Sequence, residues 1–203
     1  YRSLFVGIVR CVLETVITWS RTVIFAAVSL KFSEYGAKVV INYNKSKDKA
    51  ENIVKNINTL AAKNKCNIIV PVDWNTSSSV NGNPAYKSLK DMSSEDMILD
   101  IGKSTIDLIS KTIDNSNTVF WNGPAGYYEN KNFSTGTLSI ANKIAENTKS
   151  KSLISIVGGG DTVAAIKNTG LENVFTHLST AGGAFLESLE GKELPGIKVL
   201  KKN

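Results

Sequence analysis

Three consecutive glycines separate a short apolar segment from a helix near residue 160. Residues 155–157 (Ser-Ile-Val) predict a buried strand, and Asp161 and Thr162 open a helix expected at 162–168. A strand–glycine–helix junction presents unpaired backbone amides at the positive end of a helix dipole, which favours phosphate binding. Glycine permits a positive φ and the close approach of phosphate oxygens. Asp161 could hold Mg²⁺ together with those phosphates.

Short apolar segments alternate with longer amphipathic ones along most of the chain. This pattern predicts an α/β fold, a parallel sheet with helices on both faces in a Rossmann-like three-layer arrangement. The strands are expected at 38–43, 67–72, 117–121, 153–157 and 174–178, and the helices at 46–64, 103–114, 135–147, 162–168 and 183–190. Residues 75–84 are rich in Ser, Asn and Thr and predict an exposed loop.

A second glycine turn follows the last expected strand. Residues 179–184 (Ser-Thr-Ala-Gly-Gly-Ala) lead into the helix expected at 183–190. Both helix starts would lie at the carboxyl edge of one parallel sheet, where open α/β sheets bind ligands. Two alternatives stay open: a glycine turn can be a tight turn without a ligand, and Asp161 could serve only as a helix N-cap.

Several motifs occur in order along the C-terminal part of the chain. They are Trp-Asn-Gly-Pro at 121–124, Gly-Thr at 136–137, Gly-Gly-Gly-Asp-Thr at 158–162, the turn at 179–184 and Leu-Glu-Gly-Lys-Glu-Leu-Pro-Gly at 189–196. Together with residues 68–73 and 97–102, they closely resemble the C-terminal half of the phosphoglycerate kinase fold, its nucleotide-binding domain, over about residues 58–203. Lys103 and Ala181 depart from the family pattern without removing a charge or a donor.

The resemblance implies phosphoryl transfer between ATP and 3-phosphoglycerate, with Mg²⁺ and ATP or ADP bound by this half. The residues implied to contact the nucleotide are Leu99 (adenine), Asn122, Pro124 and Glu129 (ribose and phosphate region), Gly159, Gly160 and Thr162 (phosphates), Asp161 (the metal, through the nucleotide), and Gly182 and Gly183 (the transferred phosphoryl group). The four glycines are the implied catalytic positions. Plainer roles are core packing for Trp121, a turn for Asn122 and a solvated carboxylate for Glu129.

Residues 29–51 resemble a different family, the short-chain dehydrogenase/reductases. The glycine turn that binds the dinucleotide in that family has no counterpart, because residues 19–26 contain no glycine and include β-branched residues that resist a positive φ. Tyr43 and Lys47, or Tyr127 and Lys131, have the reductase's catalytic spacing but lie in strand-to-loop contexts. We therefore expect a foreign segment, residues 1–57, packed on the sheet edge and joined to a kinase-like domain, 58–203. The strand at 38–43 could replace a lost kinase strand.

Charge and apolar patterning exclude some partners. Residues 1–57 hold nine Lys and Arg against four Asp and Glu, so most of the net charge of +6 lies there, scattered and without a nucleic-acid motif. Arg10, Glu14 and Arg21 interrupt the apolar residues of 4–30, which predicts neither a membrane span nor a signal peptide. Cys11 and Cys66 show no metal or disulfide spacing, which favours the cytoplasm. We expect a monomer.

Three functions remain open from the sequence. The first is the Mg-ATP/ADP-binding half of a phosphoglycerate kinase, which would need an N-terminal domain to bind 3-phosphoglycerate and would have little turnover alone. Its dissociation constant for Mg-ADP is predicted to be high micromolar to millimolar, roughly −4 to −6 kcal/mol. The second is an NAD(P)-dependent short-chain oxidoreductase fragment. The third is a non-catalytic chimeric remnant.

Overall fold

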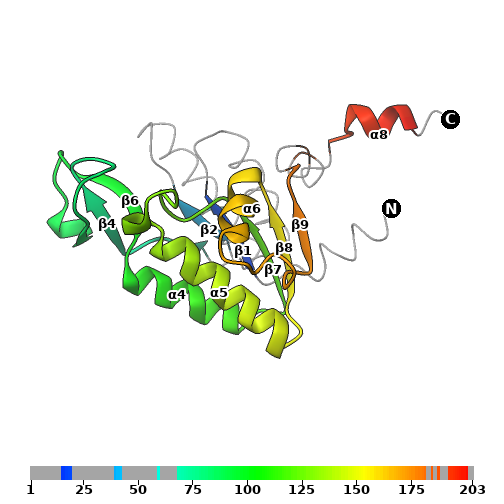
Figure 1. The fold of residues 1–203 in the computed structure, drawn as a ribbon, viewed down its shortest axis with the longest axis horizontal. Coiled ribbons are helices and arrows are strands. Elements are labelled where there is room, and N and C mark those ends of the chain that lie inside the picture. The colour runs from blue at the N-terminus through cyan, green and yellow to red at the C-terminus, as the bar shows by residue number, and fades with distance from the viewer. Residues whose placement is uncertain are drawn as a thin grey trace.

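The computed structural model describes residues 15–19, 39–42, 59, 68–181, 184, 187 and 192–200. In this part of the chain, a parallel sheet lies beside a smaller antiparallel one, and helices pack against them (Figure 1). The fold is therefore α/β with an added antiparallel sheet.

The parallel sheet has six strands in the order β3-β2-β1-β7-β8-β9. Their bounds are β1 Thr15–Trp19, β2 Val39–Asn42, β3 Ile68–Ile69, β7 Thr118–Asn122, β8 Ile154–Gly158 and β9 His177–Ser179. Every residue of β7 is buried, so both of its faces are covered, as is usual for a central parallel strand. Asn122 pairs with Gly158, and Gly158 with Ser179. The carboxyl ends of β7, β8 and β9 thus line up at one edge.

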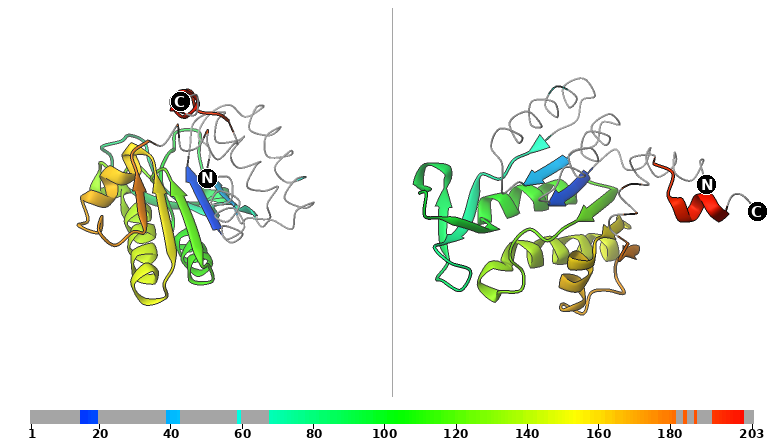
Figure 2. Two further views of the ribbon diagram at one scale, coloured as in Figure 1. Left: turned by 90° about the vertical axis from the view of Figure 1, so that its right-hand side faces the viewer. Right: turned by 90° about the horizontal axis from the view of Figure 1, so that it is seen from above.

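Three helices pack together on one face of this sheet (Figures 1 and 2). They are α4 Lys103–Asp114, α5 Thr135–Ser150 and α6 Gly160–Lys167. In α5, Ile140, Ala141, Ile144 and Ala145 form a buried stripe at helical spacing. This stripe joins Trp121 of β7 in one apolar core. The described C-terminal part adds α8, Pro195–Leu200, at the far end of Figure 1.

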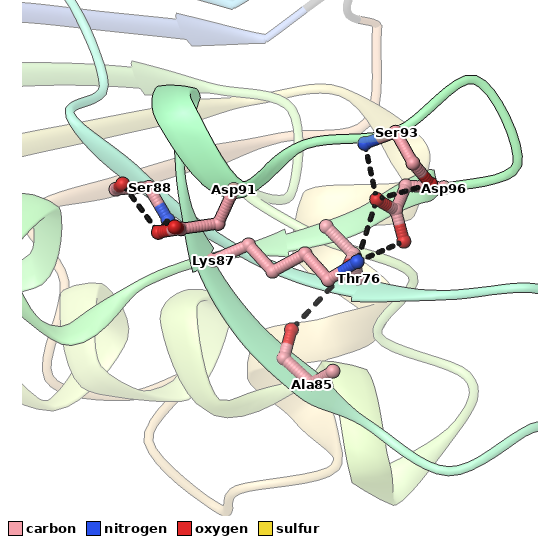
Figure 3. A network of polar contacts seen from close by, with 7 residues as sticks. All are labelled: Thr76, Ala85, Lys87, Ser88, Asp91, Ser93 and Asp96. Atoms are coloured by element: carbon pink, nitrogen blue, oxygen red, sulfur yellow. Dashed lines mark hydrogen bonds and ion pairs between the residues drawn. The ribbon is translucent and has the colours of Figure 1, made fainter.

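The second sheet is antiparallel, in the order β5-β4-β6. Its strands are β4 Asp73–Ser77, β5 Ala85–Ser88 and β6 Met97–Ile101, and the short helix η1 Leu89–Asp91 follows β5. Figure 3 shows the polar contacts that hold its connections. Lys87 Nζ lies 2.9 and 2.8 Å from the two oxygens of Asp96, and the backbone amide of Ser93 donates to the same carboxylate at 2.7 Å. These bonds fix the turn that leads from η1 into β6.

Several sequence-based boundaries are confirmed. The strands expected at 38–43, 117–121 and 153–157 are β2, β7 and β8, and the helices expected at 103–114 and 135–147 are α4 and α5. Helix α6 begins two residues earlier than expected, and β9 begins three residues later. The helices expected at 46–64 and 183–190 lie outside the described residues, except for three single positions.

The prediction of an exposed loop at 75–84 was wrong for its first three residues. Asn75, Thr76 and Ser77 belong to β4 and are buried. Hydrogen bonds satisfy part of these polar side chains: Asn75 Nδ2 donates to the carbonyl of Asn132 at 3.0 Å, and Thr76 Oγ1 to that of Ala85 at 3.1 Å, while Asn75 Oδ1 is buried without a partner. Likewise, of the strand expected at 67–72, only Ile68–Ile69 form a strand, β3. The chain then enters the antiparallel sheet, which was not predicted.

Residues 15–19 do not lie at the sheet edge, where we expected the segment 1–57 to pack. They form β1, which pairs with β2 on one side and with β7 on the other. The β-branched residues of this strand suit an interior parallel position.

None of the helices in the described part of the chain combines the length and the apolarity that a membrane span requires.

Candidate functional site

The glycine loop after β8 has the conformation that the sequence predicted. Gly159 has a φ of 97° and is the N-cap residue of α6. Its amide donates to the carbonyl of Ser179 in β9 at 3.1 Å. A Cβ at Gly159 would lie 3.2 Å from Asn122 Oδ1 and 3.4 Å from Thr162 Oγ1. The position therefore requires glycine both for its backbone angle and for space.

The start of α6 offers unpaired donors. The amides of Gly160, Asp161 and Thr162 have no acceptor within the described residues, and the first bond of the helix runs from the Val163 amide to the Gly159 carbonyl at 3.0 Å. A Cβ at Gly160 would meet no atom within 4 Å. The Gly160 position therefore borders open space at the positive end of the helix dipole, an arrangement that suits an anion.

Asn122, the last residue of β7, lies against this loop. Its side chain is 4% exposed, and its Nδ2 is buried without a hydrogen-bond partner in the structure. Since a buried amide donor is costly when it is left unpaired, a ligand oxygen at this point would relieve the cost.

Thr162 and Trp121 hold the turn that follows β7. Thr162 Oγ1 accepts from the amide of Gly123 at 2.7 Å, and Trp121 Nε1 donates to the carbonyl of the same residue at 2.8 Å. Both side chains are fully buried. Trp121 is thus a core residue. The Thr162 hydroxyl accepts from the protein and keeps its own O–H as a donor, so the phosphate contact of Thr162 stays a prediction.

The two acidic residues predicted from the sequence are Glu129 and Asp161. Burial raises the pKa of Tyr128, and the negative charges of Glu129 and Asp161 raise it further. Both acids are exposed. The N-cap residue of α6 is Gly159, so the alternative role of Asp161 as an N-cap was wrong.

Leu99 and Pro124 complete the described part of the predicted set. Leu99 is a buried residue of β6, and its carbonyl accepts from the amide of Tyr127 at 2.7 Å. Pro124 is partly exposed in the segment between Gly123 and Tyr127. Leu99 thus lies beside the segment that carries Glu129, and this segment leads back to the glycine loop through Gly123.

Some predicted positions cannot be placed or do not assemble. Gly182, Gly183, Tyr43 and Lys47 lie outside the described residues. Tyr127 precedes the short helix η2 Lys131–Phe133 rather than sharing it with Lys131, so this pair does not form the reductase arrangement. In the part of the chain that the structure describes, no three His, Cys, Asp or Glu residues could hold a metal ion. Mg²⁺ often binds through one carboxylate together with phosphate oxygens, and Asp161 could contribute that carboxylate.

The fold and site define an α/β protein with a glycine-rich loop that leads into a helix at the carboxyl edge of a parallel sheet. The family model "Phosphoglycerate kinase" matches residues 6–192, and the chain belongs to the phosphoglycerate kinase family. The match begins well before residue 58, and the division of the chain near residue 57 stays a prediction.

Individual relatives agree with this assignment. Phosphoglycerate kinase from Brucella melitensis is 45% identical over 146 residues, which is 70% of this chain and 36% of the relative. The Methylorubrum extorquens protein is 44% identical over 157 residues, 76% of this chain and 39% of the relative. The structure of phosphoglycerate kinase from Coxiella burnetii superposes with a TM-score of 0.81 at 26% identity, covering 98% of this chain and 58% of that one. The chain thus spans well under two thirds of these proteins.

Proposed function

We propose that this chain is the C-terminal half of a phosphoglycerate kinase and binds Mg-ATP or Mg-ADP. The observation that carries the proposal is the convergence of three unpaired amides at the start of α6, the unpartnered Asn122 Nδ2 and the exposed Asp161 carboxylate. Phosphoryl transfer depends mainly on positioning and on charge neutralisation, and these groups supply both. Mg²⁺ bound with the nucleotide would neutralise phosphate charge between Asp161 and the ligand.

Transfer to 3-phosphoglycerate would require the remainder of a full-length kinase. The matched part of the chain corresponds to 36% of the Brucella relative. We therefore propose nucleotide binding for this chain alone and turnover only when an N-terminal domain is supplied. That the chain is monomeric and cytoplasmic stays a prediction.

Calorimetric titration with Mg-ADP tests the proposal directly. We expect a dissociation constant in the high micromolar to millimolar range, as predicted from the sequence. The absence of heat at millimolar ligand, or a constant below one micromolar, would contradict the proposal. NADPH serves as the control ligand: a rise in melting temperature with NADPH but not with ADP would favour the reductase alternative.

Asp161→Asn should reduce the affinity for Mg-ADP roughly tenfold, because a charge-assisted contact to the metal–nucleotide complex is lost. The loss should shrink when magnesium is omitted from the titration. Asp107→Asn is the matched control, since Asp107 is an exposed acid on α4 paired only with Lys103. Equal affinity of the wild type and Asp161→Asn in magnesium would remove Asp161 from the site.

Gly160→Ala should separate binding from folding. The added methyl group points into open space, so we expect folding to be unchanged or stabilised by about 0.5–1 kcal/mol, the usual gain for Gly to Ala in a helix. Affinity for Mg-ADP should fall roughly tenfold, because the methyl group occupies space that a phosphate would approach. Thermal unfolding and calorimetry on the same sample measure both. Unchanged affinity would show that the phosphates do not lie over Gly160.

A further inference from the structure

The segment of residues 123–134, the connecting loop, joins β7 to α5 and contains Glu129. Its first residue, Gly123, donates its amide to Thr162 Oγ1 of α6 at 2.7 Å, so the loop is attached to the start of that helix. Four hydrogen bonds attach this loop and the start of α5 to the second sheet and its β4–β5 turn. They run from Tyr127 N to Leu99 O (2.7 Å), from Gly136 N to Asp100 Oδ2 (2.8 Å), from Asn75 Nδ2 to Asn132 O (3.0 Å) and from Asn130 Nδ2 to Val80 O (2.7 Å). The second sheet, absent from the sequence-based prediction, therefore supports the loop.

Asp100 lies at the centre of this contact. It is 1% exposed, and its second oxygen accepts from the amide of Ile101 at 2.9 Å. A Cβ at Gly126 or at Gly136 would overlap the carboxylate, so the backbones of the connecting loop and of α5 both touch it. Ser134, the N-cap residue of α5, makes no side-chain cap, and Asp100 provides the acceptor in its place. An acid buried this deeply is costly, and neutral residues could fill a purely structural position.

We propose that Asp100 is a positioning residue of the nucleotide site, which fixes the connecting loop so that Glu129 is held on a segment attached to the start of α6. The role rests on the nucleotide function proposed above and concerns the ribose and adenine side of the ligand. The phosphate side depends on α6, which Asp100 does not touch. Disturbing Asp100 should therefore weaken the binding of a nucleotide but not that of pyrophosphate, which lacks the nucleoside.

The test compares Asp100→Asn with the wild type at pH 8, using Mg-ADP and Mg-pyrophosphate in separate titrations. We expect roughly tenfold weaker Mg-ADP binding and unchanged Mg-pyrophosphate binding. Asp73→Asn is the matched control. Asp73 accepts from the Ser104 and Thr105 amides at 2.9 and 2.8 Å at the start of α4, in the way that Asp100 serves α5, but does not contact the connecting loop. It should leave the ratio of the two affinities unchanged.

Hydrogen exchange supplies a readout that does not depend on a ligand. The amide of Tyr127, protected in the wild type by Leu99, should exchange faster in Asp100→Asn and not in Asp73→Asn. Should Asp100→Asn fail to fold, Asn130→Ala detaches the same loop at its partly exposed end and should change the ratio in the same direction, roughly threefold.

The outcomes separate the two proposals. A wild type that binds neither ligand overturns the nucleotide function, and the role of Asp100 with it. A wild type that binds both, with an affinity ratio unchanged in Asp100→Asn or in its substitute Asn130→Ala, overturns only the positioning role. Equal weakening of both ligands does the same, because it indicates a general structural role.

Discussion

Gly159→Ala should abolish detectable Mg-ADP binding and lower the free energy of unfolding by about 1–3 kcal/mol, the usual cost of a backbone conformation that only glycine adopts readily. The φ of 97° is unfavourable for alanine, and the new Cβ would lie 3.2 Å from Asn122 Oδ1. Relief of either strain would move the loop away from Asn122 and turn the amides of α6 from their common direction. Calorimetry and urea unfolding of one preparation measure both effects.

Gly170→Ala is the matched control for this variant. Gly170 also has a positive φ, 71°, but a Cβ there would meet no atom within 4 Å, and the residue follows the C-terminal end of α6. It should lose stability through backbone strain alone and keep its affinity for Mg-ADP. If Gly170→Ala lost binding to the same extent, the effect of Gly159→Ala would reflect stability rather than the geometry of the loop.

The parallel strands β2, β7 and β8 could be predicted from the sequence because their signals are local, whereas β1 was not among the expected strands. Val119, Phe120 and Trp121 form an uninterrupted apolar run bounded by polar residues, which is typical of a strand covered on both faces. The second sheet could not be predicted in this way. Asn75, Thr76 and Ser77 are buried and polar, and their burial depends on partners far along the chain, such as the carbonyl of Asn132. The order of polar and apolar residues within 73–77 does not indicate such a distant partner.

The candidate site shows the same division. The need for glycine at Gly159 follows from the residues on either side, and the structure confirms its positive φ. The interactions between distant segments could not be predicted from the sequence. The Thr162 hydroxyl accepts from the Gly123 amide, and Asp100 in the second sheet accepts from the Gly136 amide at the start of α5. Asp100 was visible only as one residue of a family-like stretch. Asp100 is buried because the backbones at Gly126 and Gly136 pack directly against its carboxylate.

The stability of the protein should fall as the pH rises from about 4.5 to 7.5, and Asp100→Asn should remove most of this fall. Burial raises the pKa of Asp100 from 3.8 to about 7, although the amides of Gly136 and Ile101 act in the opposite direction. Because the pKa is higher in the folded state, the contribution of Asp100 is fully present below pH 3.8 and is lost as the pH rises through about 7. The change is on the order of 4 kcal/mol.

Other shifted carboxylates act in a different pH window. Hydrogen bonds from Lys87 and Ser93 lower the pKa of Asp96 to about 2, and hydrogen bonds from two lysines lower that of Asp114. Their contributions are present above pH 3.8 and are lost only in stronger acid. Among the described residues, Asp100 should therefore dominate the slope above pH 4.5. Urea unfolding at four pH values, with Asp73→Asn as the control that keeps the slope, measures it. Parallel curves for the wild type and Asp100→Asn would mean that Asp100 is ionised throughout this range, its burial offset by the two amides that it accepts from.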